Sequence, residues 1–372
     1  MNLKKPKSPD AVLLSLIVLM VAGGFLIFSS ASLGLMARGG ATFASVAFSQ
    51  FVFGVIGGGI AMFLMSNVYY RNWRKYAFYL FIFSLLATVA VFIPGIGMNH
   101  AGATRWLDLG FTTVQPSEFL KIGFVIYLAT WFSGVHDKIE NWKYGLLPFG
   151  TIVAIVGAIM LLQPDTDTFL IMVFAGMAMY ITAGAKWRDI GLIFLAGIIM
   201  LIIVAATRPY IMDRFTTFLH PDIDPQGSGY QINQSLIAVG SGGITGRGFG
   251  QSIQKFQYLP EPIGDSIFAV YAEEFGFIGA LLLIITLVFL TLRGFKTATQ
   301  VSDIFGTLLV VGFMTIIIAQ AFLNIGAMVA LAPLSGLPLP FISHGGTALM
   351  ATLASLGIVL NVSKYRTFIK SS

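Results

Sequence analysis

The residue with the clearest potential for chemistry is Asp265, which stands where a polar, glycine-rich stretch runs into an apolar segment of membrane-crossing length. The stretch begins near residue 230 and also carries Arg247, Lys255 and Glu261. A carboxylate at the boundary between water and membrane is partly desolvated, which raises its pKa towards that of a useful general base. The competing interpretation is structural, because Asp is a common N-cap. From the residues alone, the cap is better supported.

A second group of candidates lies around the start of another apolar segment. Pro116 fits the first position of a helix, which makes Glu118 an acid of the first turn and places Lys121 one turn deeper. At this spacing the two side chains can form a structural ion pair, which we favour over a ligand site, although charges inside membrane helices are often functional. Arg105 precedes Trp106, and an arginine beside an aromatic at an outer surface suits a phosphate or a lipid headgroup.

The glycine-rich run 240–250 permits two interpretations. It is not a phosphate-binding P-loop or a dinucleotide fingerprint, because neither the Gly-Lys-Ser/Thr ending nor a strand before it is present. It is either a flexible surface loop or a set of backbone N–H groups for an anion, helped by Arg247 and Lys255. Further along, Glu273 and Glu274 cannot both face lipid cheaply, so at least one should point into the protein.

The composition predicts what positions these residues. Of the 372 residues, 56% are hydrophobic and only 10% are charged, with a mean hydropathy of +0.85. Soluble proteins carry roughly 25% charged residues, so we predict an all-α polytopic membrane protein with a single domain spanning residues 1–372. The absence of cysteine excludes disulfides and thiolate metal sites, and the four histidines form no spaced metal motif. The sequence predicts no cofactor and leaves a divalent-cation requirement open.

Apolar runs of membrane-crossing length predict about ten helices. They lie at 11–31, 43–66, 77–94, 116–133, 145–163, 168–184, 190–206, 267–292, 304–328 and 346–362. The first run follows three lysines but is longer than the apolar part of a signal peptide, so we interpret it as an uncleaved first span.

The basic residues set the orientation. With the N-terminus inside, the inner segments carry 15 of the 22 Lys and Arg residues, which places both termini in the cytoplasm. The net charge of +6 does not indicate nucleic-acid binding, because these residues lie in short loops between spans. The longer connections, at 95–115, 207–266 and 329–345, then lie on the outer face. The functional loop is expected at 207–266.

Five segments together resemble one family. The resemblance rests on GATRWLDLGFTTVQPSEFLK (102–121), QPDTDT (163–168), GYQINQSLIAVGSGGITGRGFGQSIQKFQYLPEP (229–262), FAVYAEEFGFIG (268–279) and LPLPFISHGG (337–346). In this order, over nearly the whole chain, they are similar to the SEDS (shape, elongation, division and sporulation) family. The GQSxQK run followed by YLPE resembles the FtsW branch more than the RodA branch.

The resemblance implies a function and a set of site residues. Family members polymerise the glycan of peptidoglycan from lipid II at the outer face of the bacterial cytoplasmic membrane, with a class B penicillin-binding transpeptidase and other division proteins as partners. The family's essential acid falls on Asp265. The remaining substrate-binding residues that we carry over or infer are Arg105, Glu118, Lys121, Arg247, Lys255 and Glu261.

This chain also departs from the family pattern. Ile263-Gly264 replaces a usual His-Thr pair, Ser266 replaces Phe, and Asp167 stands where glycine is expected. The aspartate itself is retained.

Two other classes of function compete with a polymerase. A flippase that moves lipid II would use the same intramembrane charges, but it should also show polar binding features towards the inside. A purely structural division scaffold leaves the outward-facing acids and bases unexplained. Within the polymerase class, the elongation (RodA-type) role is the alternative to division.

Overall fold

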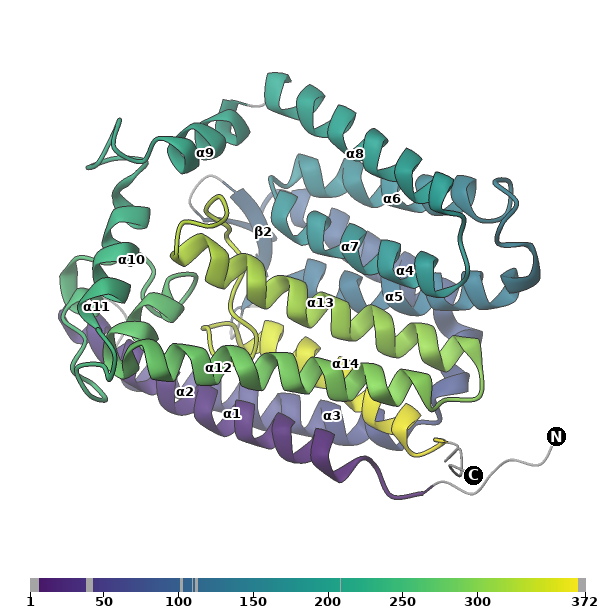
Figure 1. Cartoon of the computed structure of the whole chain (residues 1–372), viewed down its shortest axis with the longest axis horizontal. Coiled ribbons are helices and arrows are strands. Elements are labelled where there is room, and N and C mark those ends of the chain that lie inside the picture. Colours follow the sequence, from purple (N-terminus) through teal and green to yellow (C-terminus); the bar gives the residue numbers. More distant parts are fainter. Residues whose placement is uncertain are drawn as a thin grey trace.

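The computed structural model describes residues 7–37, 43–100, 103–108, 110, 113–207 and 209–366. Most of this part of the chain is helical, and the long helices run side by side along one direction (Figure 1). The main helices are α1 (Ala11–Ser32), α2 (Phe43–Ser49), α3 (Gly58–Asn67), α4 (Trp73–Val89), α5 (Pro116–Gly134), α6 (Leu146–Leu162), α7 (Thr166–Thr182), α8 (Trp187–Thr207), α9 (Pro209–Leu219), α10 (Tyr230–Ser241), α11 (Gln254–Gln257), α12 (Ile267–Thr299), α13 (Ile304–Met328) and α14 (Gly346–Ser363).

Every apolar segment predicted from the sequence is helical in the structure. Within the described residues, seven helical stretches are long and apolar enough to cross a membrane, and α6 and α7 are apolar but shorter. The chain is therefore a polytopic, mostly helical protein, as predicted. Five of the basic residues used for the orientation (Lys4, Lys5, Arg38, Arg208 and Lys370) lie outside the described residues.

The second apolar segment is one continuous helix with an irregular middle. Between α2 and α3 the chain winds as a π-helix, η2 (Gln50–Gly57). Small residues let this helix approach α14: a Cβ on Gly58 would lie 2.7 Å from Cδ1 of Leu353, and one on Gly54 would lie 3.0 Å from Cδ2 of Leu349. The Gly54/Gly58 pair therefore allows close packing of this helix against α14.

The connection 95–115 contains a small antiparallel sheet, which the sequence analysis did not predict. Its strands are β1 (Gly97–His100), β2 (Ala103–Asp108) and β3 (Thr113–Val114), in the order β1-β2-β3. Met98 pairs with Trp106, and Leu107 pairs with Val114. Arg105 therefore projects from the middle strand of a sheet.

The segment 207–266 is more ordered than the polar loop that we expected. It contains α9, α10 and α11, which gather with β2 at one end of the helix bundle (Figure 1). At the opposite end, the start of α1 meets the end of α14: Lys7 N donates to Lys364 O at 3.0 Å, and Asp10 pairs with Arg293 at 2.9 Å and also with Arg366. The two described ends of the chain therefore lie on the same side of the bundle.

Helix α12 is broken near its start at Gly276, whose φ of 65° and ψ of −166° are accessible mainly to glycine. The glycine-rich run closes the break with its own backbone. Arg247 N donates to Glu273 O at 3.0 Å, and Gly248 N donates to Glu274 O at 2.9 Å. In return, Phe277 N and Ile278 N donate to the carbonyls of Gly243 and Ile244. The run is therefore a structural partner of α12, and the interpretation as an anion-binding set of N–H groups is wrong for these groups.

We predict that Gly276→Ala destabilises the protein. A Cβ there would lie 2.3 Å from Gly246 N, and the backbone conformation alone costs about 1–3 kcal/mol for a residue other than glycine. The Tm of the purified protein in detergent should fall. Gly59→Ala is the matched control, because a Cβ at Gly59 meets nothing within 4 Å, and its Tm should not fall. An unchanged Tm for Gly276→Ala would contradict this account of the break.

Candidate functional site

Asp265 lies just before α12, but it is not the cap of that helix. The N-cap is Ser266, and no side-chain hydrogen bond caps this end. Among the described residues, no group donates a hydrogen bond to the Asp265 carboxylate, which remains partly exposed. The preferred structural interpretation from the sequence is therefore wrong. Asp265 is a carboxylate whose oxygens remain available to a ligand.

The surroundings of Asp265 favour its protonated form. Burial raises the pKa of Asp265 to about 7, and the nearby carboxylates of Glu261 and Asp167 contribute to the rise, while Arg105 and Arg214 oppose it. The neutral carboxyl therefore stabilises the fold at low pH, and this contribution is lost as the pH rises through about 7. A group with a pKa near neutrality can exchange a proton with a hydroxyl at working pH.

The segment between α13 and α14 faces Asp265. A Cβ added to Gly336 would lie 3.4 Å from Nη1 of Arg105 and 3.9 Å from Oδ2 of Asp265, so these two charged groups border the same space. Asn324 Nδ2 donates to the backbone carbonyls of Asp265 and Leu337, both at 2.8 Å. One amide therefore fixes the chain on both sides of this space.

Arg105 is held by the connection between α6 and α7. Its Nε donates to Gln163 O at 3.4 Å, its Nη2 donates to Pro164 O, and its Nη1 lies 3.8 Å from Oδ1 of Asp165. The two carbonyl oxygens orient the guanidinium at Nε and Nη2, and the carboxylate of Asp165 lies on the side of Nη1. Nη1 is the atom that borders the space beside Asp265.

Glu118 and Lys121 form the ion pair that the sequence predicted. Both carboxylate oxygens lie 2.8 Å from Nζ of Lys121, and both side chains are buried. Nζ also donates to Oε1 of Gln320 at 2.9 Å, and Gln320 Nε2 donates to Pro338 O at 2.8 Å. A cavity of about 20 Å³ adjoins the pair, which is room for about one water molecule. The pair thus supports the segment that faces Asp265.

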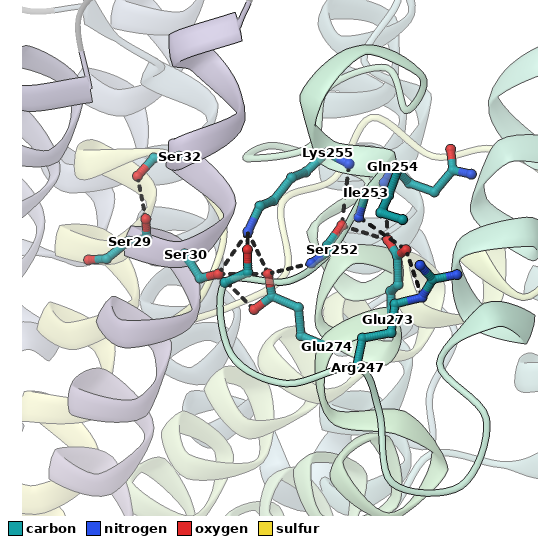
Figure 2. A network of polar contacts seen from close by, with 11 residues as sticks. Ser29, Ser30, Ser32, Arg247, Ser252, Ile253, Gln254, Lys255, Glu273 and Glu274 are labelled. Carbon is teal, nitrogen blue, oxygen red and sulfur yellow. Dashed lines mark hydrogen bonds and ion pairs between the residues drawn. The ribbon is translucent and has the colours of Figure 1, made fainter.

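Lys255 and Arg247 belong to a different network (Figure 2). Nζ of Lys255 is fully buried and lies 2.6 Å from Glu274, and it also donates to Ser30 Oγ at 3.2 Å. Arg247, which is partly exposed, lies 3.4 Å from Glu273. Lys255 lies in the polar stretch singled out from the sequence, yet its side chain is buried, and its charge is neutralised by Glu274 of α12.

The structure therefore groups the predicted residues into three sets. The first set is Arg105 and Asp265, which border one space, with Glu261, whose charge acts on Asp265. The second is the Glu118–Lys121 pair, which supports the segment facing Asp265. The third is Lys255 and Arg247, which bind α12. Sequence reasoning did not identify Gly336, Asn324 and Arg214 as parts of the site. Arg214 approaches through Asp167 from 47 residues away, so no local pattern revealed it. Within the described part of the chain, no three His, Asp or Glu side chains converge to hold a metal ion.

Comparison with known proteins now decides the family. The FtsW/RodA/SpoVE model, described as "Cell cycle protein", matches residues 10–368. The chain belongs to this family. The resemblance inferred from the five segments is confirmed, and the chain is a multi-pass membrane protein.

Relatives in the FtsW/RodA/SpoVE family match along almost their full length. "Stage V sporulation protein E" of Bacillus subtilis is 39% identical, covering 97% of this chain and 98% of the relative. "Probable peptidoglycan glycosyltransferase FtsW" of Geobacter sp. (strain M18) is 35% identical, again with 97% and 98% covered. Both matches agree with the family assignment.

Solved structures agree on the fold. The rod shape determining protein RodA of Thermus thermophilus has a TM-score of 0.70 at 28% identity, covering 96% of this chain and 97% of that chain. A chain from a structure described as "Structural coordination of polymerization and crosslinking by a peptidoglycan synthase complex" has a TM-score of 0.79 at 28% identity, with 96% and 98% covered. The helix arrangement is that of the family.

We predict that Glu118→Ala and Lys121→Ala each destabilise the protein. Removing one partner leaves a buried charge unpaired, which costs about 3–5 kcal/mol. Thermal unfolding in detergent should show a lower Tm for each single variant. The exchanged double variant, Glu118→Lys with Lys121→Glu, should recover part of the loss. Wild-type Tm values in both single variants would show that the pair does not support the fold.

Proposed function

We propose that this protein is a peptidoglycan glycosyltransferase that polymerises lipid II during cell division. The observation that carries the proposal is the Asp265 carboxylate, which has a pKa near 7, accepts no hydrogen bond from the described residues, and shares its space with Arg105. Relatives that match nearly the whole chain bear the name peptidoglycan glycosyltransferase. An acid with these properties matches what this reaction needs from a general base.

The proposed reaction is a displacement at the anomeric carbon of the donor sugar. The 4-hydroxyl oxygen of the acceptor sugar forms a bond to the anomeric carbon of the donor, while the bond from that carbon to the prenyl diphosphate breaks. The carboxylate of Asp265 takes the hydroxyl proton, and the diphosphate leaves with the bonding electrons. Nη1 of Arg105 can meet the charge of the leaving group, because guanidinium binds phosphate oxygens well.

The other predicted residues act around this pair. We propose that Glu118 and Lys121 act through Gln320 and Pro338 by holding the segment opposite Asp265. Glu261 contributes to the raised pKa of Asp265. Lys255 and Arg247 act through α12, which they brace through Glu274 and Glu273, rather than by direct contact with a diphosphate.

We further propose about ten spans, both termini in the cytoplasm, and Asp265 at the outer face of the bacterial cytoplasmic membrane. The excess of Lys and Arg in the segments on the side of the termini supports this orientation. A class B penicillin-binding transpeptidase is the proposed partner. This is supported by the similarity to a chain from a peptidoglycan synthase complex that couples polymerization with crosslinking.

We predict that Asp265→Asn abolishes most of the polymerase activity without harming the fold. Asparagine keeps the size of the side chain but cannot take a proton, and losing a positioned base costs about 10²–10⁴ in rate. The variant should retain its Tm, because the wild-type fold already favours an uncharged group here. Purified wild-type and variant proteins are incubated with labelled lipid II, and the glycan product is measured.

The control for this experiment is Asp137→Asn, which makes the same change at an exposed position at the other end of the bundle. It should polymerise at the wild-type rate. Full glycan synthesis by Asp265→Asn would contradict the catalytic assignment. Loss of lipid II translocation with polymerisation retained would favour a flippase.

The orientation gives a separate prediction, which the absence of cysteine makes easy to test. Ser228→Cys, in the exposed turn between α9 and α10, should react with a membrane-impermeant thiol reagent in intact cells. Asp137→Cys, between α5 and α6, should react only after the membrane is opened. The reverse pattern would invert the topology.

A further inference from the structure

Asp167 connects three parts of the chain at the candidate site. It is the second residue of α7, and its Oδ2 accepts a hydrogen bond from Gly336 N at 3.1 Å. The same oxygen lies 2.9 Å from Nη1 of Arg214, on α9. One carboxylate oxygen thus joins α7, α9 and the segment between α13 and α14.

The contact with Gly336 places Asp167 next to the reacting groups. The open side of Gly336 is bordered by Arg105 Nη1 and Asp265 Oδ2. Any shift of Gly336 would therefore change the space between the proposed base and the proposed diphosphate-binding arginine. Asp167 fixes that position by a hydrogen bond to backbone, which does not depend on the side chains of the segment.

The charges around Asp265 come from four different elements. Glu261 lies on the same loop, Asp167 on α7, Arg105 on β2 and Arg214 on α9. Two uncharged side chains also contact this stretch: Gln231 of α10 donates to the Ser266 hydroxyl, and Asn324 of α13 donates to the backbone carbonyl of Asp265. His344 is joined to the loop through its backbone N–H, and its ring stacks on Phe28 with centroids 5.9 Å apart.

We propose that Asp167 is a positioning residue: with Arg214 it holds the Gly336 segment against Asp265 and sets the charge that the Asp265 carboxylate experiences. The proposal rests on the proposed function of Asp265 as the general base. It assigns α9 a defined task, since Arg214 is the residue through which this helix acts on the site.

Asp167 and Arg214 have opposite effects on the pKa of Asp265, so the direction in which that pKa shifts in each variant tests the proposal. Asp167 raises the pKa of Asp265 and Arg214 lowers it. Asp167→Asn retains an oxygen for Gly336 N but removes the negative charge, so the pKa of Asp265 should fall. Arg214→Gln removes a positive charge, so that pKa should rise. The double variant should lie between the two single variants.

The experiment uses the full chain in detergent and a readout that needs no substrate. A hydrophobic carbodiimide reacts with protonated carboxyl groups, and mass spectrometry of the peptide localises the adduct to Asp265. The midpoint of labelling against pH is compared among wild type, Asp167→Asn, Arg214→Gln and the double variant. Asp137→Asn and Arg74→Gln are the charge-matched controls at exposed positions, and they should leave the midpoint unchanged.

We expect the midpoint to move to lower pH in Asp167→Asn and to higher pH in Arg214→Gln, while Arg214→Lys keeps the wild-type midpoint. The acidic limb of the pH profile of the polymerisation rate should move in the same directions. Should Asp167→Asn not fold, Arg214→Gln and Arg214→Lys decide the question alone. Unchanged midpoints, or shifts of both charge-removing variants in one direction, would overturn the proposal.

The outcomes also separate this proposal from the proposed function. If the wild-type protein makes no glycan but the labelling midpoints move as expected, the proposed polymerase function is wrong and the electrostatic role of Asp167 is supported. If the wild-type protein makes glycan but the labelling midpoints do not move, only the proposed role of Asp167 is wrong.

Discussion

The position of Asp265 depends on a break in the backbone of α12. Gly276 separates the first turns of this helix from the remainder, and the freed carbonyls of Glu273 and Glu274 would be unsatisfied without an outside partner. The backbone of the glycine-rich run supplies the donors. The side chain of Glu273 also pairs with Arg247 of the same run, and that of Glu274 accepts a hydrogen bond from Ser30 of α1. The first turns of α12, which follow Asp265, are thus held by contacts within the protein.

The acids of this region show how environment separates carboxylates of the same chemical type. Glu273 accepts hydrogen bonds from the Ser252 hydroxyl and from backbone N–H groups, and Glu274 pairs with Lys255 at 2.6 Å. These partners hold both glutamate side chains in place. Asp265 has no comparable donor among the described residues, and nearby acids and burial favour its proton. The two glutamates have hydrogen-bonding partners and stabilise the fold. Asp265, whose carboxylate accepts no hydrogen bond from the described residues, is left for proton transfer.

The sequence predicted what depends on local pattern. Apolar run lengths located the helices, and the spacing of Glu118 and Lys121 predicted their ion pair. The family resemblance singled out Asp265. These features could be read because each depends on neighbours within one or two turns or on a motif.

The sequence could not predict which polar groups meet across the fold. Lys255 looked like a solvent-facing base in a polar loop, yet it is buried against a glutamate 19 residues away. The glycines around residue 246 left two interpretations open, a flexible loop or an anion site. Neither included their backbone bonds to α12, because the sequence does not show that this helix is broken at Gly276. Arg214 reaches the site through Asp167 on another helix. Pairings at such separations depend on the tertiary arrangement, which composition and periodicity do not encode.

The central claim is that Asp265 accepts the proton of the acceptor hydroxyl with a pKa near neutrality. The most direct measurement is the pH dependence of kcat/KM for glycan synthesis from lipid II by the purified wild-type protein. The account predicts that activity rises with pH through a single ionisation close to pH 7, where the carboxyl group loses its proton. A rate that stays constant down to about pH 5, well below that ionisation, would contradict it.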